Sequence, residues 1–406
     1  MDDTQHARAY SRGWLLLLTL LTAFSSLSTD MYLPALPIIA QEYGVTTQHV
    51  ANTLAAYFLG LACGQLFYGP LSDRFGRKPP LYFGLALYIV ASLCCALAPN
   101  ETVLLICRVF QALGGCAGVV IARAAIRDRL DIRESAQVFS SMLLVMGLAP
   151  VLAPAFGVLL IQYFHWSSIF YLLTLIGVLT LILVHLYFQE TLPVDKRHVV
   201  PFKRILYSYL KLFQSPTFSL PMLAGACSYG IIYCYLSASS NLFIDFLGLS
   251  KQTFVYLFAI NAFSLIVFSS MNKRLIRSFT VYQLFKGGCF IQLSGIVMIN
   301  LCAWLNFPNL YVIMLGLFLL IGGIGITGPN SIAIVLHSQS SQAGLASALM
   351  GCVQFLTGFV MGIILFFLPF NILQNISLTT LIAITISLFL AYQNIQDRAA
   401  YPTLSR

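Results

Sequence analysis

The sequence predicts an all-α integral membrane protein, with twelve transmembrane helices in two six-helix bundles, and three observations support this fold class. Of the 406 residues, 59% are apolar and only 9% are charged, whereas ordinary soluble proteins carry about 25% charged residues. The apolar residues gather in long runs. The basic residues between the runs lie almost all on one side of the expected membrane. Together these patterns exclude a soluble protein.

The apolar runs are long enough to cross a bilayer, which takes about 20 residues in a helix. Twelve runs follow one another, and the longest polar insertion divides them six and six. We therefore expect an N-terminal bundle at 1–189, a cytoplasmic linker at 190–216 and a C-terminal bundle at 217–406. The runs cover approximately residues 14–39, 49–70, 80–98, 102–124, 136–162, 167–189, 217–246, 252–271, 282–304, 309–335, 343–367 and 373–394.

The basic residues predict the orientation of these helices. With the N-terminus inside, 20 of the 22 Lys and Arg residues fall on the inner side, only Lys251 falls outside, and Arg108 lies within a run. Lys and Arg resist translocation, so both termini and the linker are expected in the cytoplasm. The net charge of +9 then follows from topology, and no nucleic-acid partner is expected.

Other functional classes lack their sequence signatures. The ten cysteines lie in apolar runs without a CxxC pair, and the six histidines form no HExxH-like pair, so neither disulfides nor a metal site are expected. No nucleophile with an adjacent base and no Walker loop is evident. The sequence therefore predicts neither an enzyme nor an ATP-driven pump, and it calls for no cofactor. The 190–216 segment is also too small for the soluble part of a receptor.

A polar stretch between the second and third runs, GPLSDRFGRKPPL at 69–81, carries the strongest family signal. It resembles the signature G-x-L-a-D-R-x-G-R-[KR]-x-x-L of the major facilitator superfamily. The resemblance implies a two-bundle transporter whose conformational change is controlled by this loop, with a charge relay among Asp73, Arg77 and Asp128. The alternative is an ordinary basic loop with solvated ion pairs worth little. The predicted switch residues are Gly69, Asp73, Arg74, Gly76, Arg77, Lys78 and Asp128.

The second half contains only a degenerate counterpart of this loop. The sequence NKRLIRSF at 272–279 keeps the basic residues but lacks the aspartate and the glycines. The internal repeat is therefore weak, and it depends on the family resemblance.

Two ionisable residues inside apolar runs are the candidates for proton coupling. Asp30 lies within SLSTDMYLPALP, where a charged side chain costs roughly 2.5–3.5 kcal/mol on insertion scales. A carboxyl group exposed alternately to two environments can carry a proton, although a permanently paired packing aspartate is the alternative. Pro34 and Pro37 are expected to kink or end this helix. Arg108 and Gln111 match the family pattern R-x-x-Q-G, from which Ala112 departs. Arg108 could compete with the proton on Asp30, or could instead extend its charge to the membrane surface.

Two further patterns narrow the resemblance. TDMYLPALP in the first run and ETLP at 190–193 resemble the bicyclomycin and chloramphenicol resistance (Bcr/CflA) branch of the drug:proton antiporters. This branch implies proton-driven export of small drugs, such as bicyclomycin- or chloramphenicol-like compounds, across the bacterial inner membrane. The expected partners are the drug, protons and the lipid bilayer, with the protein acting as a monomer. Export of a metabolite, such as an amino-acid derivative or siderophore, remains the alternative.

The fifth run resembles the antiporter motif G-P-x-x-G-G. Pro150, Pro154 and Gly157 match this motif, while Ala153 replaces a glycine. Two prolines four residues apart remove two helix hydrogen bonds and bend the helix. The bend could prevent proton leak, or it could be plain helix architecture.

Aromatic and amide side chains within the runs are candidates for a substrate cavity. Aromatic faces with scattered hydrogen-bonding groups suit varied amphipathic ligands. The alternative for each is an interhelical hydrogen bond worth roughly 0.6 kcal/mol. The candidates are Tyr32, Tyr57, Gln111, Tyr229, Tyr233, Asn241, Asn261, Asn330 and Gln354.

Overall fold

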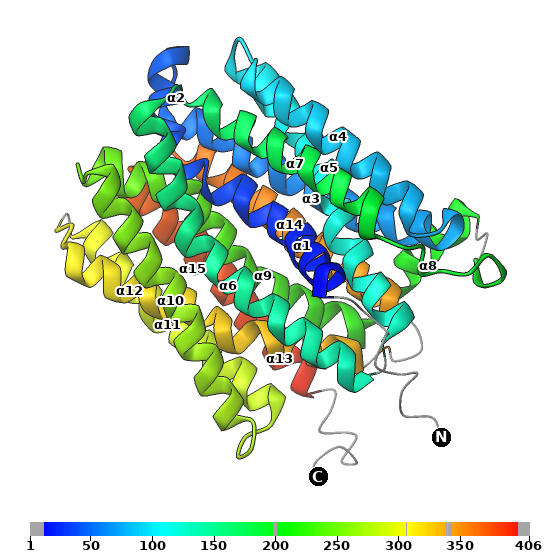
Figure 1. Cartoon of the computed structure of the whole chain (residues 1–406). Helices are drawn as coiled ribbons and strands as arrows, with labels where there is room; N and C mark the ends of the chain where they lie inside the picture. The colour runs from blue at the N-terminus through cyan, green and yellow to red at the C-terminus, as the bar shows by residue number, and fades with distance from the viewer. Residues whose placement is uncertain are drawn as a thin grey trace. The chain divides into compact units, whose positions relative to one another are not determined.

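The structure, a computed structural model, describes residues 12–130, 132–197, 201–305, 307–337, 339 and 343–396. Every regular element in these ranges is helical (Figure 1). By length and composition, 11 of the described helices can cross a membrane. A further helix, α6 (Ile132–Tyr163), contributes the shorter apolar stretch Ala149–Tyr163. These helices confirm the predicted all-α membrane class and are consistent with the predicted count of twelve.

The chain divides into two compact units, Met1–Phe202 and Lys203–Arg406. The division falls inside the 190–216 segment that the sequence marks as a linker. This segment also contains a helix that the sequence reading did not anticipate, α8 (Phe202–Gln214). Within α8, Leu206, Tyr207 and Leu210 are exposed, whereas Tyr209 and Leu212 are buried.

Unit 1 is built from seven longer helices and two short 3₁₀ turns. The side chains of Thr46 and Asn100 accept hydrogen bonds from the backbone three residues on, at His49 and Val103, and so begin two of these helices. The elements besides α6 are α1 (Arg12–Asp30), η2 (Leu33–Ala35), α2 (Leu36–Tyr43), α3 (Thr47–Phe75), α4 (Lys78–Ala96), α5 (Glu101–Arg129), α7 (Ser167–Tyr187) and η3 (Val194–Lys196).

The first apolar run is broken in the middle. Helix α1 ends at Asp30, and Pro34 and Pro37 stand in the first turns of η2 and α2. Proline lacks the N–H that would continue the preceding helix, so the kink expected from the sequence is present. Helix α6 packs directly on the break, because a Cβ atom at Gly157 would overlap the backbone carbonyl oxygen of Met31.

The end of α2 remote from the break is pinned to the start of α7. One carboxylate oxygen of Glu42 accepts hydrogen bonds from Trp166 Nε1 at 2.6 Å and His165 Nε2 at 2.8 Å. The Tyr43 hydroxyl donates to the carbonyl oxygen of Ala98 at 2.7 Å. The half of the broken span that follows the break is thus held at its far end.

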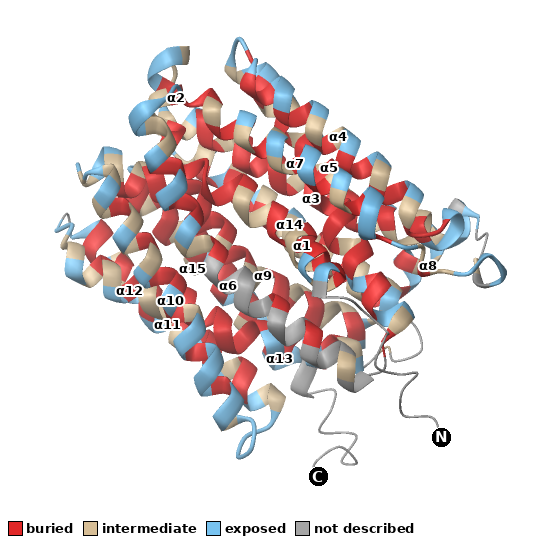
Figure 2. Ribbon diagram, in the orientation of Figure 1, coloured by how far each residue is buried: buried red, intermediate tan, exposed pale blue. Residues whose placement is uncertain are grey.

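Close backbone contact joins α3, α4 and α5. A Cβ at Gly60 would collide with the Val109 carbonyl oxygen, and one at Gly114 would lie 2.5 Å from the Tyr88 nitrogen. Small residues at such crossings let membrane helices approach closely. The outward faces remain apolar: Phe83 and Val90 of α4 are exposed, and Figure 2 shows this helix alternating between buried and exposed turns. Such faces suit a lipid environment.

Unit 2 repeats the long-helix pattern with two irregularities. The run expected at 309–335 is interrupted at Gly323, and the run expected at 217–246 ends in a π-helical turn, η4. The elements are α9 (Pro216–Ser240), η4 (Asn241–Phe246), α10 (Lys251–Leu275), α11 (Val281–Trp304), α12 (Leu310–Gly322), α13 (Ile324–His337), α14 (Ala343–Phe367) and α15 (Ile372–Gln396).

Candidate functional site

Asp30 is the buried carboxyl group at the break in the first span. It is 3% exposed and accepts a hydrogen bond from Thr29 Oγ1 at 2.9 Å. Among the residues that the structure describes, Asp30 takes part in no ion pair. No described residue therefore serves as the permanent ionic partner of Asp30.

Arg108 of α5 lies in an aromatic cage. Its guanidinium carbon is 4.3 Å from the ring centroid of Tyr57, 4.8 Å from that of Tyr32 and 5.7 Å from that of Phe170. The side chain is fully buried, so the alternative in which it reaches the membrane surface is wrong. Cation–π contacts with several rings offset part of the cost of burying the charge.

Within this cage only some of the N–H groups of Arg108 have hydrogen-bond partners. Arg108 Nη1 donates to Gln111 Oε1 at 2.5 Å, and Gln111 Nε2 donates to Ser92 Oγ at 2.8 Å. The guanidinium Nε and Nη2 are buried without a hydrogen-bond partner. Within the described ranges Arg108 forms no ion pair, either with Asp30 or with another acid. An unpaired buried cation is a functional candidate by default.

Tyr32 connects the two candidates through the chain. It lies two residues after Asp30, its ring faces Arg108, and its hydroxyl is 3.0 Å from Thr53 Oγ1. The break after Asp30 therefore places one side chain against the buried cation. Of the predicted cavity residues in unit 1, Tyr32, Tyr57 and Gln111 all surround Arg108.

The second cluster assembles the predicted charge relay. Arg77 Nε and Nη2 donate to the two carboxylate oxygens of Asp128 at 2.8 and 3.1 Å. Arg77 Nη1 donates to Asp73 Oδ1 at 2.5 Å and to Ser72 Oγ at 2.7 Å. Burial alone would lower the pKa of Arg77, but the hydrogen bonds and charges of Asp128 and Asp73 raise it above its ordinary value. A bidentate pair of this kind fixes orientation as well as charge.

Glu190 completes this cluster, and the sequence reading assigned it no part in the loop. Its carboxylate accepts hydrogen bonds from the backbone N–H groups of Arg77 at 2.8 Å and Lys78 at 3.1 Å, and from Thr191 and Leu192 at 3.0 Å. Glu190 therefore occupies the positive N-terminal end of α4. The signal was present in the ETLP sequence, which had served only as a family marker.

The electrostatics of Glu190 follow from these donors. Burial alone would raise its pKa, but the backbone hydrogen bonds from Leu192, Arg77 and Lys78 and the charge of Arg197 lower it below its ordinary value. Arg197 Nη2 lies 3.8 Å from Glu190 Oε2. Thr191, the next residue, donates to Asp128 Oδ2 at 2.8 Å. The segment after α7 thus holds the loop on both sides of Arg77.

Gly76 is required at this corner for two reasons. Its φ angle is +90°, a conformation that other residues rarely adopt. A Cβ there would also lie 2.5 Å from Glu190 Oε2. The remaining predicted loop residues contribute less to the cluster: the Arg74 guanidinium stacks on the adjacent Phe75 at 5.1 Å, the Lys78 ammonium lies over Tyr82 at 5.7 Å, and Gly69 has open space beside it.

The antiporter-motif residues all lie on α6. Pro150 and Pro154 lie inside α6, and Gly157 meets the carbonyl of Met31 next to Asp30. The structure therefore brings the motif to the break in the first span. Whether the bend has a role in proton coupling stays a prediction.

The predicted cavity residues of unit 2 fall into two groups. The ring centroids of Tyr229 and Tyr233 lie 5.7 Å apart with the rings tilted by 57°, and the centroids of Tyr233 and Phe355 lie 5.4 Å apart. The amides of Asn261 and Asn330 are buried and donate to Tyr235 Oη at 3.0 Å and Asn272 Oδ1 at 2.8 Å. These two amides make the interhelical bonds that were the alternative to substrate contact. Asn241 begins η4 and Gln354 is half-buried on α14.

Unit 2 contains a cluster of uncharged polar side chains that the sequence did not predict. Ser228 Oγ of α9 donates to Gln292 Oε1 of α11 at 2.8 Å and lies 2.6 Å from Thr327 Oγ1 of α13. Gln292 Nε2 also donates to the Leu320 carbonyl oxygen at 3.3 Å. Three fully or nearly fully buried polar side chains therefore join three helices. The available signal was the presence of single polar residues in otherwise apolar runs.

Long apolar helices that hold buried, unpaired ionisable groups define a multi-pass membrane transporter. The sequence profile of the Major Facilitator Superfamily matches residues 18–364, so the chain belongs to this superfamily. It is a transporter and not an enzyme. Family membership confirms the prediction made from the 69–81 loop.

Curated relatives are similar over most of their length. An uncharacterized MFS-type transporter, YdgK, of Bacillus subtilis is 31% identical over 84% of this chain and 85% of its own. A bicyclomycin resistance protein homolog of Haemophilus influenzae is 30% identical, with coverage of 86% and 87%. The multidrug resistance protein MdtL of Klebsiella pneumoniae is 29% identical, with coverage of 80% and 81%. These names are consistent with the predicted Bcr/CflA branch.

Solved structures agree on the fold. A D-xylose–proton symporter matches with a TM-score of 0.74 at 14% identity, covering 94% of this chain and 96% of that one. An inward-facing bacterial homolog of the human lysosomal transporter Spinster matches with a TM-score of 0.70 at 16% identity, covering 96% and 99%. At these identities the likeness concerns the fold alone.

Proposed function

We propose that this protein is a proton-coupled exporter of small drugs, working by alternating access in the bacterial inner membrane. Asp30 carries the proton, and Arg108 supplies the fixed positive charge near its path. The observation that carries the proposal is the carboxyl group of Asp30, buried at a helix break with no ion pair among the described residues. Relatives named for bicyclomycin and multidrug resistance support the substrate class.

The position of Asp30 suits a group that takes up a proton on one side and releases it on the other. It ends α1 at the point where two prolines interrupt the span, and a helix break allows the two halves to move separately. A carboxyl group without a permanent cation can exchange its proton as its surroundings change. The Arg77 cluster, in this proposal, controls the conformational equilibrium without contacting substrate.

Transport in proteoliposomes under an imposed pH difference tests the coupling. Asp30→Asn keeps the size of the side chain but fixes the neutral state, so it should bind a drug yet fail to concentrate it. Asp30→Glu should retain partial activity with a shifted pH optimum. Asp245→Asn, which removes the acid at the end of a span in unit 2, is the matched control and should accumulate drug. Full pH-driven accumulation by a well-folded Asp30→Asn protein would exclude Asp30 as the essential carrier.

The substrate class needs its own assay. A susceptibility panel on cells lacking and overproducing the protein should show resistance to bicyclomycin- or chloramphenicol-like compounds. If resistance is unchanged but an amino-acid derivative or siderophore leaves the cells faster, the protein is a metabolite exporter on the same fold.

The proposed orientation places both termini and the 190–216 segment in the cytoplasm. Single cysteines introduced at positions 2, 205 and 400 of a cysteine-free protein should resist an impermeant thiol reagent in intact cells. They should react after the membrane is opened. Ready labelling from outside would overturn this topology.

A further inference from the structure

The helix that precedes the first span of unit 2 has an exposed apolar face. α8 has only 13 residues, so it is about 20 Å long and too short to cross the hydrocarbon core. Leu206, Leu210 and Phe213 follow one another at helical spacing and therefore share one face. These residues are 44–54% exposed. Exposed apolar side chains that are grouped in this way indicate an interaction surface.

The other sides of α8 differ from this apolar face. Tyr209 and Leu212 are buried within the protein. Arg204 and Lys211 are exposed, and they lie roughly 140° around the helix axis from the apolar face. Residues 201–216 contain no Asp or Glu. The helix therefore has one side against the protein, one apolar side and one basic side without acidic groups of its own.

The end of α8 is joined directly to a membrane span. Ser215 alone separates α8 from α9, which begins the candidate span Pro216–Phe246. The Ser215 N–H donates to the Leu212 carbonyl oxygen at 3.1 Å, and the Ser215 carbonyl oxygen accepts from the Ser219 N–H at 2.8 Å. Ser215 thus closes the last turn of one helix and opens the first turn of the next. No flexible linker lets this end of α8 leave the bilayer surface.

We propose that α8 lies in the bilayer interface, with its apolar face towards the acyl chains and its basic residues on anionic headgroups. An amphipathic helix with basic residues on its polar side lies in the membrane plane in this way. Lys203, Arg204 and Lys211 are all exposed, and such residues next to a span attract anionic lipids. The adjoining span brings lipid close to the apolar face, so the bilayer is favoured over a protein partner.

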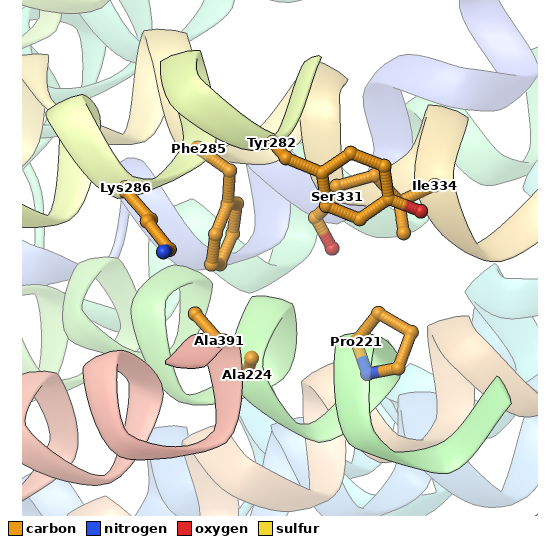
Figure 3. A pocket seen from close by; sticks show the side chains of 8 residues that line it. All are labelled: Pro221, Ala224, Tyr282, Phe285, Lys286, Ser331, Ile334 and Ala391. Atoms are coloured by element: carbon orange, nitrogen blue, oxygen red, sulfur yellow. The ribbon is translucent and has the colours of Figure 1, made fainter. Parts of the chain in front are cut away.

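The half-buried Lys286 of α11 offers no comparable surface. Its ammonium nitrogen lies 3.9 Å from the ring centroid of Tyr392 on α15. Figure 3 shows the side chain beside a small pocket between helices, next to Phe285 and Ser331. This pocket has room for about one water molecule. A phospholipid headgroup does not fit there, so the exposed basic side of α8 is the better match for anionic lipid.

Fluorescence quenching in the full-length protein tests this placement without reference to transport. A cysteine-free protein receives one cysteine, at position 210 or at position 204, which is labelled with the polarity-sensitive dye NBD. The protein is reconstituted into phosphatidylcholine vesicles with or without phosphatidylglycerol. Lipid that carries a nitroxide on the upper acyl chain should quench the dye at position 210 several-fold more than the dye at position 204. The emission from position 210 should also shift to shorter wavelength.

Two results at position 210 would overturn the placement of α8. Emission like that in water, without quenching by the nitroxide lipid, would show that the apolar face is in solvent. Emission at short wavelength without quenching would show that protein covers this face instead, from this chain or from a second copy. Both substituted positions are exposed, so the labels replace no side chain of the core.

Charge variants test the preference for anionic lipid. In vesicles with phosphatidylglycerol, Lys211→Gln should lower the partition of the dye at position 210 into the bilayer about five-fold, as expected for one basic residue near an anionic surface. Lys211→Arg should retain it. Lys273→Gln, which removes an exposed lysine of α10, is the control and should leave it unchanged. Equal quenching in Lys211→Gln and the unsubstituted protein would overturn the role of anionic headgroups.

Discussion

The two units accommodate polar side chains within their apolar helices in different ways. Unit 1 holds 12 basic and 11 acidic residues, unit 2 ten and two. In unit 1 the buried Arg77 meets two more exposed acids, whereas Asp30 and Arg108 are buried and take part in no ion pair among the described residues. In unit 2 neutral groups such as Ser228, Gln292 and Thr327 join the helices. The difference shows that the buried Asp30, Arg77 and Arg108 all belong to unit 1, whereas uncharged side chains join the helices of unit 2.

The largest difference should appear when the Arg77 cluster is broken. Arg77→Met leaves Asp128 and Asp73 without the cation between them. Because the Asp73 side chain is 57% exposed and that of Asp128 is 16% exposed, the cost should be at most about 3 kcal/mol, the lower end for breaking a buried pair. Thermal unfolding in detergent should show this loss. Arg74→Met, which removes an exposed cation of the same loop, should change stability little. Similar unfolding temperatures for the two variants would mean that the cluster does not stabilise unit 1.

The contact between α6 and the broken span should give the next largest effect. An added methyl group in Gly157→Ala overlaps the Met31 carbonyl oxygen, and overpacking of this kind costs about 1–3 kcal/mol. Gly287→Ala is the control in unit 2, because nothing lies within 4 Å of its added Cβ. The unfolding temperature should fall only for Gly157→Ala. An unchanged Gly157→Ala protein would show that α6 can shift freely against the break.

Glu190 should make the stability of unit 1 depend on pH. Because its pKa lies below the ordinary value of 4.5, its carboxylate contributes stability that is present above that value and is lost as the pH falls through the folded-state pKa. The gap in unfolding temperature between wild type and Glu190→Gln should therefore shrink as the pH falls from about 5 to about 3. The effect should be moderate, because the side chain is 27% exposed.

A matched acid in the same segment supplies the control for Glu190. Asp195→Asn removes an exposed carboxylate after α7, and its unfolding curve should follow that of the wild type across the same pH range. A constant gap between wild type and Glu190→Gln would contradict the assigned role.

The smallest effect is expected in the neutral network of unit 2. Ser228→Ala removes a hydroxyl that donates to Gln292 and is hydrogen-bonded to the Thr327 hydroxyl, and interhelical hydrogen bonds in membranes are worth about 0.6 kcal/mol. Ser294→Ala, at an exposed position of α11 that bonds only its own helix, should be neutral. A loss as large as that of Arg77→Met would remove the contrast between the two units.

The sequence was most informative where one strong physical constraint acts. Run length and the cost of charge in lipid predicted the helices, and the prolines after Asp30 predicted the break. The 69–81 loop predicted the meeting of Asp73, Arg77 and Asp128, which the structure brings within hydrogen-bonding distance. Each of these inferences uses either the sequence immediately around a residue or a motif with fixed spacing.

Contacts between distant segments were harder to predict. Glu190 lies 112 residues after Lys78 in the sequence, yet its carboxylate accepts a hydrogen bond from the Lys78 backbone at the start of α4. No local sequence pattern predicts that contact. The sequence left open whether Arg108 acts near Asp30 or reaches the membrane surface, and it did not predict that rings from three separate segments enclose it. In unit 2, Asn261 and Asn330 make hydrogen bonds between helices, because in an apolar surrounding a polar side chain is satisfied by whichever neighbour lies nearest.

The hydrogen bond between Trp166 and Glu42, at the end of α2, provides an intrinsic fluorescence probe. The chain has only three tryptophans, and the indole of Trp166 donates to Glu42 on the half-helix that follows the break. A carboxylate at the indole nitrogen alters the energy of the excited state, so separation of the pair changes the emission. With Trp14 and Trp304 replaced by phenylalanine, the remaining fluorescence reports the opening and closing of that half-helix in the unlabelled protein during turnover.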